Sequence, residues 1–202
     1  MRRNISSDDH HHHREEQIDL ALAILKKQEM EAKLSINNLQ DLLDLNTSHF
    51  SSAEIELKRK LLEWANIASS MQLKMILKKY ISFTSQHLQR MDTFLEQEKI
   101  LSVTRTNTIM LAFIKSIDEK LEACKNPEIK DACILAGIQS ICHFKISSYG
   151  TAAAFAKLIG LSEFANVFYE SEVNEKHIDD ELTQLASYEI NTNAMTPLNL
   201  TQ

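Results

Sequence analysis

Histidines and carboxylates, the side chains that bind transition metals through nitrogen and oxygen, interrupt four apolar stretches of this sequence. They are Glu54, His87, His143 and a group on the last stretch, Glu172, Glu175 and Asp179. Charge in an apolar core is costly unless something compensates it, so one such group per stretch predicts a shared centre. Inward-pointing carboxylates and histidines from four facing helices are the arrangement of diiron bundles.

Each of these residues, taken alone, has a simpler explanation. A single histidine on a helical stripe is usually a hydrogen-bonded core or boundary residue. Glu54 follows Ser51 at the spacing of a capping box, and the three acids of the last stretch could form a solvated face. Because all four stretches carry a candidate, we favour descent from a metal site over four separate coincidences.

The elements that must position these residues are helices. Apolar residues recur at steps of three and four, and only three glycines and two prolines interrupt the chain. The spacing predicts helices from a cap at Ser51 to about 68, from about 71 beyond 94, over 107–121, from Pro127 to about 158 with a kink at Gly150, and from a cap at Ser162 onward. Long helices with short joins favour a bundle over a globin-like packing.

The same pass along the sequence predicts four segments. Residues 1–14 read as a disordered polar arm, in which His10 to His13 could bind divalent metal opportunistically. Residues 15–46 form an accessory helical segment suited to association. Residues 47–191 make the four-helix bundle, and residues 192–202 a polar tail.

Composition excludes several classes of protein. A net charge of −6 argues against nucleic acid as the main partner, and no apolar run is long enough to span a membrane. The N-terminus lacks the apolar core of a secretory signal, and three cysteines, an odd number, do not suggest a disulfide framework. A cytoplasmic location is expected. The sequence has no nucleophile elbow, glycine-rich phosphate loop or zinc-protease helix.

Two ordered sets of residues point to a known family. The first is Asp131-Ala132, Gln139, His143, Ile146 and Tyr149-Gly150-Thr151; the second is Asp179, Leu182-Thr183, Leu185-Ala186 and Ile190-Asn191. With a weaker match from Ala53-Glu54 through His87 and Arg90, they resemble the YciF-like, stress-associated bacterial proteins over most of residues 47–193.

That resemblance implies a ferritin-like four-helix bundle, commonly a homodimer, with a central dinuclear metal site and no established reaction. It assigns Glu54 as the carboxylate of the first bundle helix, His87 and His143 as the histidines of the second and third, and Glu175 and Asp179 as the acids of the fourth.

The departures from the family pattern predict a degenerate site. Phe83 stands where the family has glutamate, Asn174 replaces the first of two adjacent acids, and Cys142-His143-Phe144-Lys145 replaces Glu-His-Tyr-Glu. Two divalent ions need bridging carboxylates, which these changes remove. We therefore expect no metal, or a single iron, manganese or zinc ion held by Glu54, His87, His143 and Glu175, with Cys142 and Glu172 as additional candidates.

Two functions follow from these observations. The first is a non-enzymatic, self-associating stress protein with a decayed site and an unknown protein partner. The second is an iron-dependent oxidoreductase that uses the retained ligands. Thiol chemistry at Cys142 is a weaker third hypothesis. Because several expected ligands are lost, the sequence favours the first.

Overall fold

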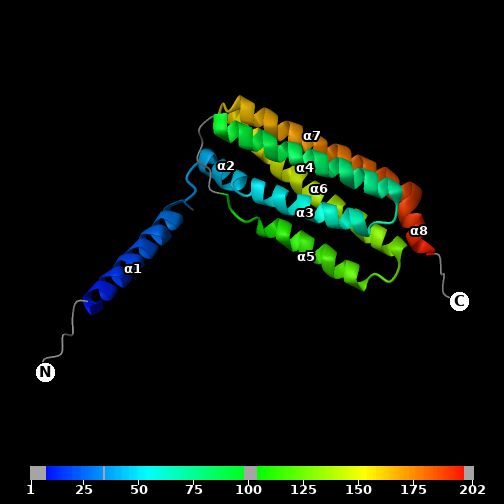
Figure 1. Cartoon of the computed structure of the whole chain (residues 1–202). Coiled ribbons are helices and arrows are strands. Elements are labelled where there is room, and N and C mark those ends of the chain that lie inside the picture. Colours follow the sequence, from blue (N-terminus) through cyan, green and yellow to red (C-terminus); the bar gives the residue numbers. More distant parts are fainter. Residues whose placement is uncertain (1–7, 34, 98–103, 198–202) are drawn as a thin grey trace, which may run out of the picture. The chain divides into compact units, whose positions relative to one another are not determined.

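A computed structural model describes residues 8–33, 35–97 and 104–197, and all regular structure in them is helical (Figure 1). The chain divides into two compact units, residues 1–42 and 43–202. The first contains helix α1 (Asp8–Lys33) and the start of α2 (Leu39–Thr47). Residues 8–14, predicted to be part of a disordered arm, are therefore helical; residues 1–7 lie outside the described part.

The second unit is an all-α bundle, as predicted. Its four long helices are α3 (Phe50–Ile67), α4 (Met71–Gln97), α6 (Pro127–Leu158) and α7 (Ser162–Leu185). Helix α3 packs along α4, and α6 packs along α7 (Figure 1). The predicted shorter helix is α5 (Thr108–Ala123), which packs on α3 and α6. A π-helical turn, η1 (Ala186–Ile190), and α8 (Asn191–Met195) follow α7, so the expected tail begins with a helix.

Local sequence explains several helix ends. Pro127 occupies the first turn of α6, and the Asn126 side chain accepts a hydrogen bond from the Ile129 amide. Gly160 ends α6 in the left-handed region, at φ 81°. Helix α6 continues without interruption through Gly150, where the sequence predicted a kink.

Two predicted caps are wrong. Helix α3 begins at Phe50 with His49 as its N-cap, so Ser51 lies inside the helix and no capping box forms. The Glu54 side chain is therefore free to point elsewhere. Helix α7 begins at Ser162, but its N-cap is Leu161, without a side-chain hydrogen bond.

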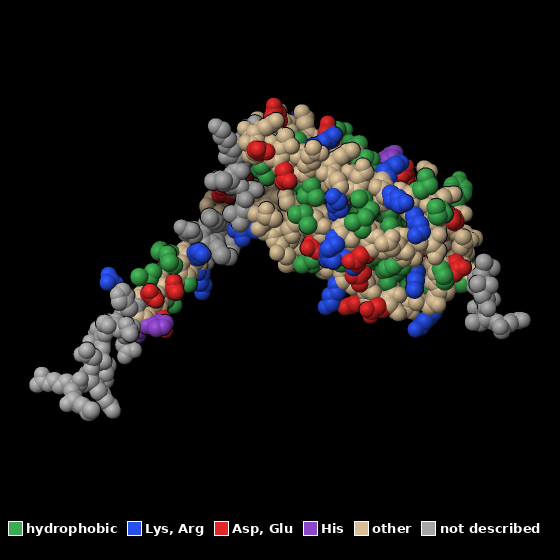
Figure 2. Space-filling view, in the orientation of Figure 1, with side chains coloured by type: hydrophobic (Ala, Val, Ile, Leu, Met, Phe, Trp, Pro, Cys, Tyr) green, Lys and Arg blue, Asp and Glu red, His purple; other side chains and the backbone are tan. Residues whose placement is uncertain are grey.

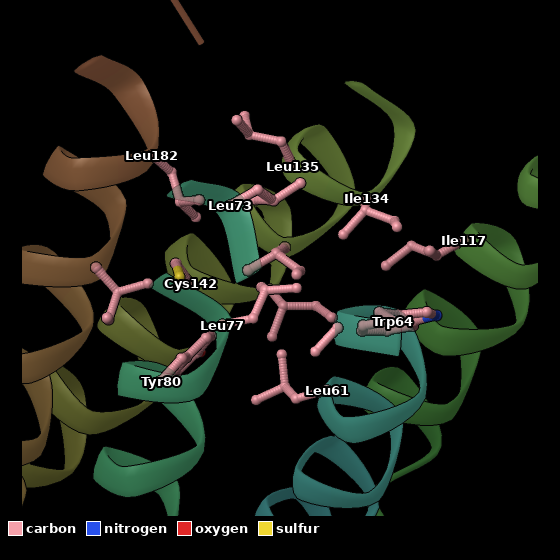
Figure 3. Packing of buried hydrophobic residues seen from close by; sticks show 14 of the residues in the cluster. Leu61, Trp64, Leu73, Leu77, Tyr80, Ile117, Ile134, Leu135, Cys142 and Leu182 are labelled. Carbon is pink, nitrogen blue, oxygen red and sulfur yellow. The ribbon is translucent and has the colours of Figure 1, made fainter. Parts of the chain in front are cut away.

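The core of the bundle has two apolar clusters. The larger one has members from every helix between α3 and α7. It includes Leu61, Trp64, Leu77 and Ile134, which lie together in Figure 3. The smaller one, around Phe50 and aromatic neighbours from α6 and α7, fills the other end. On the face seen in Figure 2, acidic and basic side chains are interspersed over the bundle. No helix in the described residues is long and apolar enough to cross a membrane.

Candidate functional site

Four ionisable side chains lie together in the interior of the bundle, one from each long helix. They are Glu54 on α3, His87 on α4, Lys145 on α6 and Glu175 on α7, and none is more than 3% exposed. Each lies on the inward stripe of its helix: His87, for example, follows Tyr80 and Thr84 at steps of four and three. The group lies between the two apolar clusters, because Tyr80 belongs to one cluster and Tyr149 to the other.

The centre of this group is the ammonium of Lys145. Its Nζ lies 2.7 Å from Glu54 Oε1 and also forms an ion pair with Glu175 Oε1. A single lysine therefore bridges carboxylates from two other helices. An ammonium in contact with two buried carboxylates supplies the positive charge that they require.

Two tyrosine hydroxyls complete the contacts of the carboxylates. Tyr149 donates to Glu54 Oε1 at 2.7 Å, and Tyr80 donates to Glu175 Oε2. Lys145 Nζ also donates to the Tyr80 hydroxyl at 3.3 Å. Burial raises the pKa of both tyrosines well above the usual value, as does the charge of nearby carboxylates, so both hydroxyls remain protonated donors.

His87 faces the carboxylates with Nδ1 and Asn174 with Nε2. The Asn174 side-chain nitrogen lies 3.2 Å from Nε2, and His87 Nδ1 lies 3.7 Å from Glu54 Oε2 and 3.9 Å from Glu175 Oε1. If Asn174 donates to Nε2, the proton of the neutral ring is on Nδ1 and points toward the acids. Asn174, which the sequence interpretation treated as the replacement of an acid, thus contacts the ring.

Glu54 Oε2 and His87 Nδ1 lack a hydrogen-bond partner here, whereas the close contact of Glu175 Oε1 is its ion pair with Lys145. One ligand atom from each of these residues lies within 4.8 Å of the others. Within the part of the chain that the structure describes, this is the one group of three or more His, Cys, Asp or Glu side chains close enough to hold a metal ion.

The pKa values of the two glutamates are shifted in opposite directions. Burial by itself would raise the pKa of Glu54, but the Lys145 ammonium and His87 lower it to about 2. Burial raises the pKa of Glu175, and Lys145 offsets this only in part, since Glu54 adds repulsion. Burial also acts to lower the pKa of Lys145, but the two carboxylates outweigh it and raise this pKa. Lys145 is therefore a cation at neutral pH.

These residues do not fit two metal ions, because Lys145 occupies the space between the carboxylates. A single divalent ion about 4 Å from the ammonium would be repelled by about 8 kcal/mol at an effective dielectric constant of about 20. Deprotonating Lys145 to relieve this costs about 5 kcal/mol at neutral pH for a lysine with its ordinary pKa, and the two carboxylates, which raise the pKa of Lys145, increase the cost. A single ion fits only if the ammonium moves or loses its proton.

His143 and Asp179, both predicted ligands, lie outside this group. The His143 side chain is 67% exposed, and its Nε2 contacts Asp179 Oδ2 at 3.0 Å. The inward stripe of α6 runs through Cys142, Lys145 and Tyr149. His143 directly follows Cys142 in the helix, so its side chain projects about 100° away from this stripe. The prediction chose the wrong stripe of a helix that is apolar on several faces.

The remaining candidates also lie off the centre. Glu172 is partly buried and pairs with Lys176 on its own helix, at 3.0 Å. Cys142 is buried, and burial raises the pKa of its thiol well above the usual value, so it is a neutral core side chain. Phe83 is half-buried with its ring against His177, and its neighbour Thr84 takes the buried position.

Sequence reasoning missed the roles of three residues. Lys145 was treated as a lost ligand, whereas it is the central cation, and Tyr80 and Tyr149 were not considered as partners of the acids. The spacing held a signal: Tyr149 follows Lys145 by four residues and Tyr80 precedes His87 by seven, so each pair shares a helix face.

Comparison with known proteins agrees with this architecture. Protein YciF of Escherichia coli (strain K12) is 29% identical over 162 residues, which are 80% of this chain and 98% of that protein. The crystal structure of the E. coli stress protein YciF superposes with a TM-score of 0.72, over 77% of this chain and 99% of that one. YcfI from Rhodopseudomonas palustris, 22% identical, shares the fold with a TM-score of 0.71, over 74% and 96% of the respective chains.

The matching region extends beyond the bundle into the end of α1. A family model described as a domain of unknown function, DUF892, matches residues 33–195, which include every helix that contributes to the buried group. The chain therefore belongs to the DUF892 family, of which YciF is a relative, and the sequence-based assignment to the YciF-like family is confirmed.

Proposed function

We propose that this chain is a non-enzymatic, self-associating protein. In the core of its bundle, a lysine ammonium replaces the metal cations of a ferritin-like centre. One observation carries this proposal: Lys145 Nζ bridges Glu54 and Glu175 in the buried interior. The carboxylates thereby acquire a cation without taking up an ion. A catalytic metal ion keeps an open coordination position for substrate, and a lysine ammonium has none. This supports a role of the centre in stability rather than in catalysis.

Self-association is supported by α1. Its large apolar side chains are about half exposed or more; they are Ile18, Leu20, Leu22, Ile24 and Leu25. Figure 2 shows hydrophobic side chains, in green, on the surface of this helix. The first half of α1 is strongly acidic, whereas the second half carries Lys26, Lys27 and Lys33 beside two glutamates and is slightly basic. Two copies of α1 packed antiparallel would cover the face that Ile18, Leu22 and Leu25 share, and would bring the acidic half of one copy beside the lysines of the other. A homodimer formed through α1 is therefore the proposed assembly, and the cytoplasm its proposed location.

The absence of catalysis is tested by Fe(II) oxidation in aerated buffer, with a variant that lacks residues 1–14 so that the histidine run adds no metal site. We expect the wild-type core, Glu54→Ala and buffer alone to give equal rates. A rate above the buffer blank that disappears in Glu54→Ala would overturn the proposal.

A second candidate, an iron-dependent oxidoreductase with one ion, is favoured by the unpartnered atoms Glu54 Oε2 and His87 Nδ1, which lie close to the Glu175 carboxylate. These residues would hold the ion, which would supply redox chemistry when bound. This candidate predicts the opposite result in the same assay. It also requires Lys145 to leave its ion pairs, so it gains support only if iron changes the reactivity of this lysine toward an amine-modifying reagent.

A further inference from the structure

A pair of cysteines lies at the join between α5 and α6, remote from the buried acids. Cys124 is the C-cap residue of α5, and Cys133 lies in the second turn of α6. Both are partly buried, whereas the third cysteine, Cys142, is buried completely. The chain turns back between them, through Asn126 and Pro127, so that the start of α6 lies beside the end of α5.

The contacts of Cys124 direct its sulfur toward α6. Its thiol donates to the Lys120 carbonyl at 3.2 Å and lies 3.8 Å from the Ile129 carbonyl oxygen. Ile129 precedes Cys133 by one helical turn, and helical side chains lean toward the preceding turn. The Cys133 thiol accordingly lies toward Cys124, whose proximity contributes to the raised pKa of Cys133.

We propose that Cys124 and Cys133 form a reversible intramolecular disulfide that ties the end of α5 to the start of α6. Hydrogen peroxide is a sufficient oxidant. The Cys124 sulfur attacks one peroxide oxygen, the O–O bond breaks, and the products are a sulfenic acid and one water. The Cys133 sulfur then attacks the Cys124 sulfur, the S–O bond breaks, and hydroxide leaves with the Cys133 proton as a second water. Two thiols lose two electrons, and one peroxide becomes two waters.

The order of attack follows from the environment of the two thiols. Burial, together with the neighbouring Cys124, raises the pKa of Cys133 to about 11, so Cys133 is almost wholly protonated at neutral pH. Because the thiolate is the attacking species, Cys133 is disfavoured as the first nucleophile, and we assign it the later step, the attack on the sulfenic acid.

The bond would strengthen the docking of α5, which is not one of the four long helices. Met110, Ile117 and Leu121 of α5 enter the larger core cluster, and Asp118 accepts a hydrogen bond from the Trp64 indole at 2.9 Å. Closing the loop between the two cysteines restricts the unfolded chain, which raises Tm by about 5–10 °C for a loop and a protein of this size.

The test treats the native full chain with hydrogen peroxide, blocks remaining thiols and maps disulfides by mass spectrometry. Trypsin places Cys124 in the peptide 121–125 and Cys133 in the peptide 131–145, together with Cys142. We expect these two peptides to be linked, with a mass decrease of about 2 Da in the intact chain. The link must persist in Cys142→Ala and vanish in Cys133→Ser, which identifies the partner.

Thermal unfolding supplies the second readout. We expect oxidised wild type to melt about 5–10 °C above the reduced protein, and Cys124→Ser to show no such difference. Disulfides between chains, a link to Cys142, or sulfinic acid at Cys124 without any link would each overturn the proposal. A linked pair with unchanged Tm would overturn its role as a tie between the two helices.

Discussion

Lys145 lies three residues after Cys142 and four before Tyr149, on the face of α6 that is turned to the core. A lysine there would be destabilising by itself, since an isolated buried ammonium is costly. Its contacts with Glu54 and Glu175 reverse this, because each carboxylate is equally unfavourable without a cation. The three side chains depend on one another, so the removal of one should cost more than the loss of a surface ion pair.

The variant Lys145→Met tests this dependence, since it keeps an unbranched side chain only one atom shorter and removes the charge. It leaves two buried carboxylates without a cation, and we expect a loss of about 3–5 kcal/mol in the free energy of unfolding at neutral pH. Urea titration followed by Trp64 fluorescence measures it. Lys176→Met is the matched control: it breaks the more exposed pair with Glu172, and should change stability by less than about 0.5 kcal/mol. Equal effects of the two substitutions would contradict the account.

The same pair of variants predicts a pH dependence. The pKa of Glu54 falls from 4.5 to about 2 in the folded protein, so its ion pair contributes stability above pH 4.5 and loses it as the pH falls toward 2. This contribution is roughly 3 kcal/mol. Lys145→Met removes it, so the stability difference between wild type and Lys145→Met should shrink between about pH 4.5 and 2. Urea titrations at several pH values measure this difference, and a constant difference would refute the prediction. The stability difference between wild type and Lys176→Met should not change with pH.

The sequence predicted the acids of the site better than its cation. Glu54, His87 and Glu175 interrupt apolar stripes on three helices whose inward face is clear, and the structure brings these residues together. Helix α6 is apolar on several faces, so spacing alone could not decide between the stripe of His143 and that of Lys145. Only packing, which makes Ile141, Cys142 and Lys145 the buried residues, resolves this choice.

Among the helices, the contact of α5 with α6 depends on a glycine. A Cβ at Gly137 would lie 2.5 Å from Ile117 Cγ1 and 2.6 Å from its Cδ1, which is closer than packed carbon atoms approach. Gly137 therefore allows α5 to pack closely on α6. Glycine inside a helix is normally unfavourable relative to alanine by about 1 kcal/mol. At this position the close packing of α5 outweighs the lower helix propensity of glycine.

Gly137→Ala should accordingly destabilise the protein by about 1–3 kcal/mol, the usual cost of overpacking, in place of the gain expected at a free helical site. Chemical denaturation measures the change. Gly150→Ala, on the same helix, is the control: its Cβ would meet only the end of the Glu172 side chain, at 3.0 Å, and that side chain can move. Combining Gly137→Ala with Ile117→Ala should cost less than the sum of both single changes. Stabilisation by Gly137→Ala would show that α5 does not pack as described.

Helix positions could be predicted well from the sequence, and helix caps could not. The ends of α3, α4 and α6 fall within a few residues of those expected, because apolar spacing, Pro127 and Gly160 mark them. The caps proposed at Ser51 and Ser162 failed, because a serine near a helix start does not determine where the first turn begins. This error mattered, since a capping role had been the alternative explanation for Glu54.

At the level of the whole molecule, α1 belongs to a compact unit separate from the bundle, and its apolar side chains are exposed. Deleting residues 1–36 should therefore lower self-association while the bundle stays folded. The shortened chain keeps Asn38, whose side chain accepts a hydrogen bond from the Asp41 amide at the start of α2. We expect sedimentation to show a shift toward monomer, with Tm changed by less than about 4 °C, the equivalent of about 1 kcal/mol.

A milder variant separates the helix from its apolar face. Leu22→Lys and Leu25→Lys together keep α1 intact and should weaken association nearly as much as the deletion. A dimer of unchanged affinity in both proteins would exclude α1 as the contact surface and place the association on the bundle.

The central claim, that Lys145 takes the place of a metal ion, is tested most directly by metal content. The measurement is elemental analysis of the chain without residues 1–14, purified without metal affinity and dialysed against zinc and then against buffer. We predict far less than one ion per wild-type chain, and close to one in Lys145→Ala, where Glu54, His87 and Glu175 lose their internal cation. One ion per wild-type chain that disappears in His87→Ala would contradict the account.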